Sequence, residues 1–98
     1  MWQLYAFSLL AGLLAANGVP HFIKGTLGQK HQTPFGKSSS AVVNVAWGAI
    51  NFIIAVIFLH FGHIRSHEDR AFIALAVGGL LISLFNARIW SKHPEYNK

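Results

Sequence analysis

The stretch that decides the fold is Ser40 to Phe61, SAVVNVAWGAINFIIAVIFLHF, which has 22 residues and no charged side chain. A helix that crosses a bilayer needs about 20 consecutive, mainly apolar residues. Residues 2–23 and 71–90 form two further runs of this kind, and the last carries one charge, Arg88, near its end. The sequence therefore predicts an all-α membrane protein: a compact three-transmembrane-helix bundle forming a single integral membrane domain over residues 1–98.

The composition supports this class. Of the 98 residues, 53% are hydrophobic and only 11% are charged, whereas soluble domains carry about 25% charged residues. A soluble chain of this size would struggle to bury so much apolar surface, and lipid as the solvent removes that difficulty. The chain has no cysteine, which excludes disulfides, thiolate metal sites and cysteine catalysis.

Basic residues predict the orientation of the three spans. The loop at 24–39 and the tail at 91–98, together with the end of the third span, carry an excess of positive charge. These basic residues are Lys24, Lys30, Lys37, Arg88, Lys92 and Lys98. The loop at 62–70 balances two arginines against two acids. Because cytoplasmic loops collect Lys and Arg, we expect the N-terminus outside and the basic loop and tail inside.

The same charges predict a lipid partner. A basic residue near an anionic membrane surface contributes about 1 kcal/mol, so we expect lipid headgroup contacts from Lys24, Lys30, Lys37 and Arg88. Nucleic-acid binding is not expected, because so little of the chain lies in water.

Small or amide-bearing residues recur every three or four positions in each span. The second span has Ala41, Asn44, Gly48, Asn51 and Ala55, the third has Ala76, Gly79, Ser83 and Asn86, and the first has Ser8, Gly12 and Ala15. Small residues let helices approach closely in a membrane, and amides hydrogen-bond across the contact. We expect these stripes to face inward, because an amide that faces lipid is costly.

The polar stripe allows two functional interpretations. Its candidate residues are Asn44, Trp47, Gly48, Asn51, Ser83 and Asn86. They either stabilise helix packing or line a pathway for a small solute. Trp47 is included because it lies beside the Asn44 and Asn51 face.

The sequence NGVPHF ends the first span and supplies a candidate mouth, formed by Asn17, Pro20 and His21. Pro20 disfavours the helical conformation for the residue before it, so the first helix is predicted to bend or break near Gly18–Pro20. His21 is either an interfacial hydrogen-bonding group or a group that binds a proton or a ligand, since its ordinary pKa is near neutrality.

The basic loop continues as TPFGKSSS. Thr33 to Gly36 predicts a turn, and the serines at 38–40 are candidate N-caps for the second span. FGKS is similar to the end of a phosphate-binding loop, but His31 stands where that motif requires glycine, so nucleotide binding is rejected.

The combination NGVPHF, TPFGK and NVAWGAINF resembles a group of uncharacterised small three-span bacterial membrane proteins, over most of the chain. The resemblance implies bacterial origin and integral membrane residence. It implies no activity, cofactor or site. From the resemblance together with the predicted orientation, we expect the bacterial inner (cytoplasmic) membrane.

Three histidines near the outer loop are a candidate metal site. His60, His63 and His67 are spaced three and four apart and would share one face of a continuous helix, which could bind zinc, copper or nickel. However, Ser66 to Asp69 fits a capping box that would start the third span near His67 and separate the histidines. A pH-sensitive loop and an ordinary polar loop are the alternatives.

Catalysis has no support in the sequence. The acids Glu68, Asp69 and Glu95 all lie outside the spans, so we expect no catalytic residues, no enzyme activity and no cofactor. Three functions remain. The first is an accessory, scaffolding or self-associating subunit, with a larger membrane-protein partner or a second copy of itself. The second is a homo-oligomeric channel or facilitator for a small neutral solute or ion, and the third is an external histidine-based metal or pH sensor.

Overall fold

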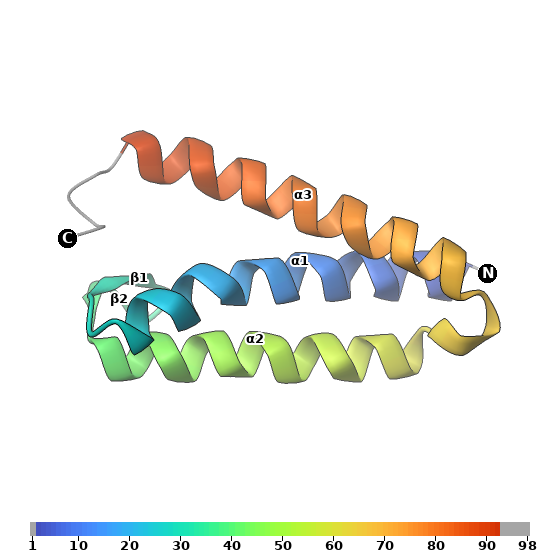
Figure 1. The fold of residues 1–98 in the computed structure, drawn as a ribbon, viewed down its shortest axis with the longest axis horizontal. Helices are drawn as coiled ribbons and strands as arrows, with labels where there is room; N and C mark the ends of the chain where they lie inside the picture. Colours follow the sequence, from blue (N-terminus) through green and yellow to red (C-terminus); the bar gives the residue numbers. More distant parts are fainter. Residues whose placement is uncertain (1, 93–98) are drawn as a thin grey trace.

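The computed structural model describes residues 2–92, and three helices dominate it (Figure 1). They are α1 (Trp2–Thr26), α2 (Ala41–Phe61) and α3 (Glu68–Lys92). A short hairpin of β1 (His31–Thr33) and β2 (Gly36–Ser39) joins α1 to α2, and the 3-10 turn η1 (Ile64–Ser66) precedes α3. Each helix is long and apolar enough to cross a membrane, so the predicted all-α, three-span fold class is confirmed.

Helix α1 lies between the other two helices and packs along both of them. Helix α2 runs beside α1 over its length, whereas α3 approaches α1 closely near the chain's N-terminus and diverges from it toward Lys92 (Figure 1). The two contacts that α1 makes are therefore different in kind.

Glycines set the distance between the helices. A Cβ atom on Gly12 would overlap the backbone carbonyl of Leu75, and one on Gly78 would overlap the carbonyl of Leu9. Between α1 and α2, a Cβ on Gly18 would lie 2.9 Å from the Gly48 oxygen, and one on Gly48 would lie 2.8 Å from the Gly18 oxygen. Both contacts therefore bring backbone against backbone, as small residues permit in membranes.

The predicted inward stripe of α2 is confirmed, since its buried residues are Asn44, Gly48, Asn51 and Ala55. The predicted stripe of α3 is only partly right: Gly79 and Asn86 are half-buried, and Asn86 bonds to α1. The buried residues of α3 are Ala71, Ala74 and Gly78, while Ala76 and Ser83 are exposed. Helix α3 packs mainly against one helix, so its contact face is narrow. Small residues occur on two of its faces, and the spacing alone does not choose between them.

The predicted break in the first helix is wrong, and no bend is shown: α1 continues through Pro20 to Thr26. Proline removes the hydrogen bond to the carbonyl four residues earlier. The turns beyond Pro20 are nevertheless held by α2. His21 hydrogen-bonds Asn44, and Gly25 lies so close to α2 that a Cβ there would be 2.6 Å from the Ala41 oxygen.

The basic loop contains a β-hairpin that the sequence did not predict, because strands of three and four residues are too short to show a period. The predicted turn is confirmed at its tip, between β1 and β2. Thr33 Oγ1 accepts a hydrogen bond from the Phe35 amide at 3.1 Å, which tightens the turn.

The two loops begin their helices differently. Ser40 is the N-cap of α2, and its side chain accepts from the Val43 amide at 3.2 Å, as predicted. Helix α3 starts at Glu68, next to the predicted position, but Ser66 donates to the His63 carbonyl at 2.8 Å instead of forming a capping box. The predicted basic tail at 91–98 lies, from residue 93 onward, outside the described residues.

Candidate ligand-binding site

Asn44 is the centre of a buried polar cluster where the hairpin meets α2. Its side chain is fully buried. Its Nδ2 lies within hydrogen-bond distance of three carbonyl oxygens, those of His31 (3.0 Å), Ser39 (3.1 Å) and Ser40 (3.0 Å). One side chain thus ties both ends of the hairpin to the first turn of α2.

The three carbonyls also determine the proton position on His21. Because carbonyl oxygens only accept hydrogen bonds, Asn44 must direct its Nδ2 at them and its Oδ1 at His21. The His21 Nδ1 lies 2.9 Å from that oxygen and must donate to it. In the neutral ring the remaining nitrogen, Nε2, is therefore a hydrogen-bond acceptor.

His31 of β1 contacts residues of both α1 and α3 and was not predicted as a site residue. Its side chain is buried, with its ring centroid 5.1 Å from that of His21 on α1 and 4.4 Å from that of Trp90 on α3. No sequence signal identifies this role, because the hairpin that places His31 between the helices was itself not predicted.

A second chain of hydrogen bonds crosses the middle of the molecule. Asn86 Nδ2 donates to Asn17 Oδ1 at 3.0 Å, and Asn17 Nδ2 donates to Asn51 Oδ1 at 3.3 Å. Asn51 Nδ2 in turn donates to the Trp47 carbonyl at 2.8 Å. The structure therefore brings together Asn17, Asn51 and Asn86, one from each helix. Asn51 and Asn86 were predicted in one polar stripe, and Asn17 was predicted separately as a mouth residue.

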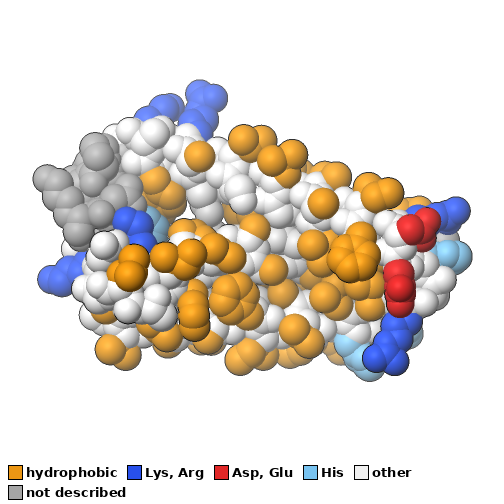
Figure 2. All heavy atoms as spheres, in the orientation of Figure 1, with side chains coloured by type: hydrophobic (Ala, Val, Ile, Leu, Met, Phe, Trp, Pro, Cys, Tyr) orange, Lys and Arg blue, Asp and Glu red, His pale blue; other side chains and the backbone are white. Residues whose placement is uncertain are grey.

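Two cavities open where α3 diverges from α1, and Asn86 and Trp90 line both of them. The first has a volume of about 360 Å³, and its polar lining consists of Asn17, His21, Gln32, Thr33, Asn86 and Trp90. The second has a volume of about 450 Å³ and adds Lys24, His31 and Ser83 to an apolar wall of Ala16, Val19 and Ala87. We call the two cavities together the α1–α3 cleft; Figure 2 shows the surface hollowed between these helices.

The predicted mouth residues Asn17, Pro20 and His21 all line the cleft. The predicted stripe divides: Asn86 and Ser83 line the cleft, whereas Asn44, Gly48 and Asn51 are buried between α1 and α2. Trp47 has another role. It is half-buried, and its ring meets Phe35 of the hairpin tip edge-on at 5.7 Å.

Charge is unevenly distributed along the molecule. Lys24, Lys30 and Lys37 lie at or near the hairpin, and Arg88 lies near the end of α3 on the same side of the molecule. Figure 2 shows lysine and arginine side chains without acids around this end, whereas at the opposite end basic and acidic side chains lie together. The α1–α3 cleft opens at the end that we call the basic end.

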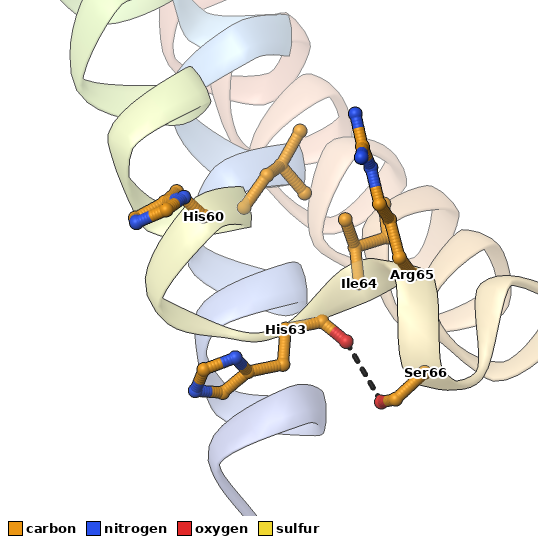
Figure 3. A pocket seen from close by; sticks show the side chains of 6 residues that line it. His60, His63, Ile64, Arg65 and Ser66 are labelled. Carbon is orange, nitrogen blue, oxygen red and sulfur yellow. Dashed lines mark hydrogen bonds between the residues drawn. The ribbon is translucent and has the colours of Figure 1, made fainter.

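The histidines at the opposite end do not form the predicted metal site. His60 lies in α2, His63 has a left-handed backbone with φ of 53°, and η1 separates it from His67. Figure 3 shows His60 and His63 beside a cavity of about 600 Å³ whose lining does not include His67. Within residues 2–92, no three histidine or acidic side chains are grouped to hold a metal ion. The continuous helix that the hypothesis required is interrupted at Gly62.

The chain was compared with family models, curated proteins and solved structures. No family model, curated protein or solved structure matches the chain.

Proposed function

We propose that this protein is an accessory membrane protein without catalysis of its own. It binds the polar end of a small membrane-resident molecule in the α1–α3 cleft. One observation carries the proposal. The helices separate at the basic end and leave cavities of about 360 and 450 Å³ lined by amides, imidazoles and an indole. Small-molecule sites occupy roughly 300–1,000 Å³ and combine apolar walls with a few convergent polar groups.

The cleft supports binding better than transport. Asn44 and Asn51, the predicted pathway residues of α2, are buried and use their amides within the protein. A solute that followed α2 would have to break these hydrogen bonds. We therefore assign Asn44 and Asn51 to helix packing and Asn86 to the binding site.

The positive charges favour a cytoplasmic position for the cleft, because Lys and Arg collect on that side of membranes. The resemblance to bacterial membrane proteins favours the inner membrane. In that orientation the N-terminus of α1 faces outward and the cleft opens at the level of the inner headgroups, where Trp residues are enriched.

A second candidate, self-association or docking on a larger membrane protein, is favoured by one feature of α3. Its large side chains Phe72, Leu80 and Leu84 are each at least 60% exposed, and it packs mainly against α1. Helix association in membranes needs such uncovered surface.

Gentle detergent extraction followed by native mass spectrometry tests both candidates. We expect the wild-type protein to retain a small molecule, and Trp90→Ala to lose most of it. Leu84→Ala is the matched control, because Leu84 is on the same helix but does not line the cleft. Equal retention by all three proteins, or retention by none, would refute the binding proposal; dimers or a foreign subunit would support the second candidate.

A further inference from the structure

We propose that the α1–α3 cleft recognises a glycerol phosphodiester, the headgroup of a phospholipid that is both anionic and hydroxylated. This inference rests on the proposed function and names its ligand class. It follows from which hydrogen-bonding groups line the first cavity and which charges surround the second.

The first cavity presents two hydrogen-bond acceptors, beside the amide of Gln32 and the indole of Trp90. His21 donates from Nδ1 to Asn44, so its neutral ring has an acceptor at Nε2. Asn86 donates to Asn17, and no donor to the Asn86 Oδ1 is found among residues 2–92. Both residues line this cavity. A ligand that pairs with both acceptors must therefore carry hydrogen-bond donors, either hydroxyl groups or a primary ammonium.

Charge decides between these donors. Lys24 lines the second cavity, and Lys30, Lys37 and Arg88 lie at the same end of the chain's fold. In an environment with this excess of positive charge, an ammonium group is repelled and a phosphate is attracted. Hydroxyl groups satisfy the acceptors without adding positive charge, so a hydroxylated, negatively charged headgroup fits best.

The second cavity completes the match. Lys24 and the Ser83 hydroxyl line it beside Trp90, while Ala16, Val19 and Ala87 form its apolar part. A phosphate beside Lys24 places its acyl chains along the apolar side of the cleft, between helices that lipid surrounds. The glycerol group would extend past Asn86 and Trp90, which line both cavities.

The test compares lipids of equal charge. The full-length protein is placed in nanodiscs that contain equal amounts of phosphatidylglycerol and phosphatidylserine in a phosphatidylcholine background, and the retained lipid is measured by native mass spectrometry. Both anionic lipids carry one net negative charge, but only phosphatidylglycerol has free hydroxyl groups. We expect at least a tenfold excess of phosphatidylglycerol on the wild-type protein.

Two variants assign this preference to the cleft. Gln32→Leu, on the hairpin, and Asn86→Leu, on α3, should each reduce the excess to about twofold or less. Gln32 lies on the hairpin and has no part in the Asn86–Asn17 hydrogen bond, so its variant remains informative if Asn86→Leu does not fold. Lys24→Gln should reduce both anionic lipids together, and Leu84→Ala should change neither.

The outcomes separate the inference from the proposed function. Equal retention of the two anionic lipids, with loss of both in Trp90→Ala, overturns the hydroxyl assignment and leaves a binding cleft. Retention that no cleft variant changes overturns both proposals. Soluble glycerophosphoglycerol distinguishes the source: if it displaces the bound lipid at equimolar concentration, the free headgroup and not the lipid is the ligand, and the lipid assignment fails.

Discussion

Helix α1 packs closely against α2 along its whole length but against α3 at one end only. Against α2, backbones meet at Gly18 and Gly48, and the buried amides Asn44 and Asn51 are hydrogen-bonded inside the protein. Against α3, backbones meet at Gly12 and Gly78, but farther along the helices separate and leave the α1–α3 cleft. The α1–α2 contact, which we call the sealed contact, is close along its length. The α1–α3 contact is close only at the end that contains Gly12 and Gly78, and we call it the open contact.

The difference shows what holds helices together in lipid. No hydrophobic force drives one apolar helix against another there, so close approach depends on small residues and hydrogen bonds. Beyond Gly79, α3 has large residues such as Leu84 and Phe85, which are exposed, and Asn86 hydrogen-bonds Asn17 of α1. The sealed contact stabilises the fold, and the open contact leaves room for a ligand.

The largest expected effect is at the sealed contact. Asn44→Leu removes the bonds to His21 and to three carbonyls, and each buried polar group left unpaired costs roughly 1–3 kcal/mol. We expect the greatest loss of thermal stability of any single substitution here, measured by circular dichroism in detergent. Val42→Ala, at a 78% exposed position in the same turn, is the control. An unchanged melting temperature for Asn44→Leu would show that the cluster does not hold the hairpin.

Two adjacent glycines, Gly78 and Gly79, test the close end of the α1–α3 contact. Gly78→Ala places a methyl group against the Leu9 carbonyl, whereas the methyl of Gly79→Ala would lie 3.5 Å from the Gly12 oxygen, an ordinary contact. Overpacking of this kind typically costs about 1–3 kcal/mol, so only Gly78→Ala should destabilise the protein.

The separation of α1 and α3 can be measured with spin labels on cysteines introduced at the exposed positions Leu10 and Val77. The chain has no cysteine of its own, so only these two positions are labelled. The distance should increase in Gly78→Ala and not in Gly79→Ala. Equal distances in both variants would contradict a contact limited by Gly78.

A smaller effect is expected at the open end. Asn86→Leu removes one half-buried hydrogen bond to Asn17, and such bonds in membranes are worth about 0.6 kcal/mol on average. The melting temperature should fall only slightly, while lipid selectivity is lost. A large loss of stability would mean that Asn86 is mainly a packing residue.

The smallest effect is expected at Ser8 in α1. Its hydroxyl is buried and has no hydrogen-bond partner among residues 2–92. Removal of an unpaired buried polar group relieves a desolvation penalty of about 1–3 kcal/mol, offset by the small void that remains. Ser8→Ala should therefore leave the melting temperature unchanged or raise it slightly, and a clear decrease would reveal a hydrogen bond to Ser8.

The residue pattern was most informative where a helix has one small face. On α2, the stripe from Asn44 to Ala55 predicted the buried residues, because the rest of the helix surface is mostly large and apolar. On α3 the same reasoning chose Gly79 where Gly78 is buried. The mouth residues Asn17 and His21 were also predicted, but their partners were not, since Asn86 is 69 positions from Asn17.

The sequence by itself determined three apolar helices, the excess of positive charge at one end and the buried stripe of α2, because these follow from length, composition and local spacing. Only the tertiary structure decided that α1 continues through Pro20, that the basic loop folds into a hairpin with His31 buried against Trp90, and that α3 diverges to leave a cleft. Each of these depends on contacts between residues distant in the chain. Between apolar helices in lipid, such contacts are specified by single glycines and amides, which a periodic pattern does not locate.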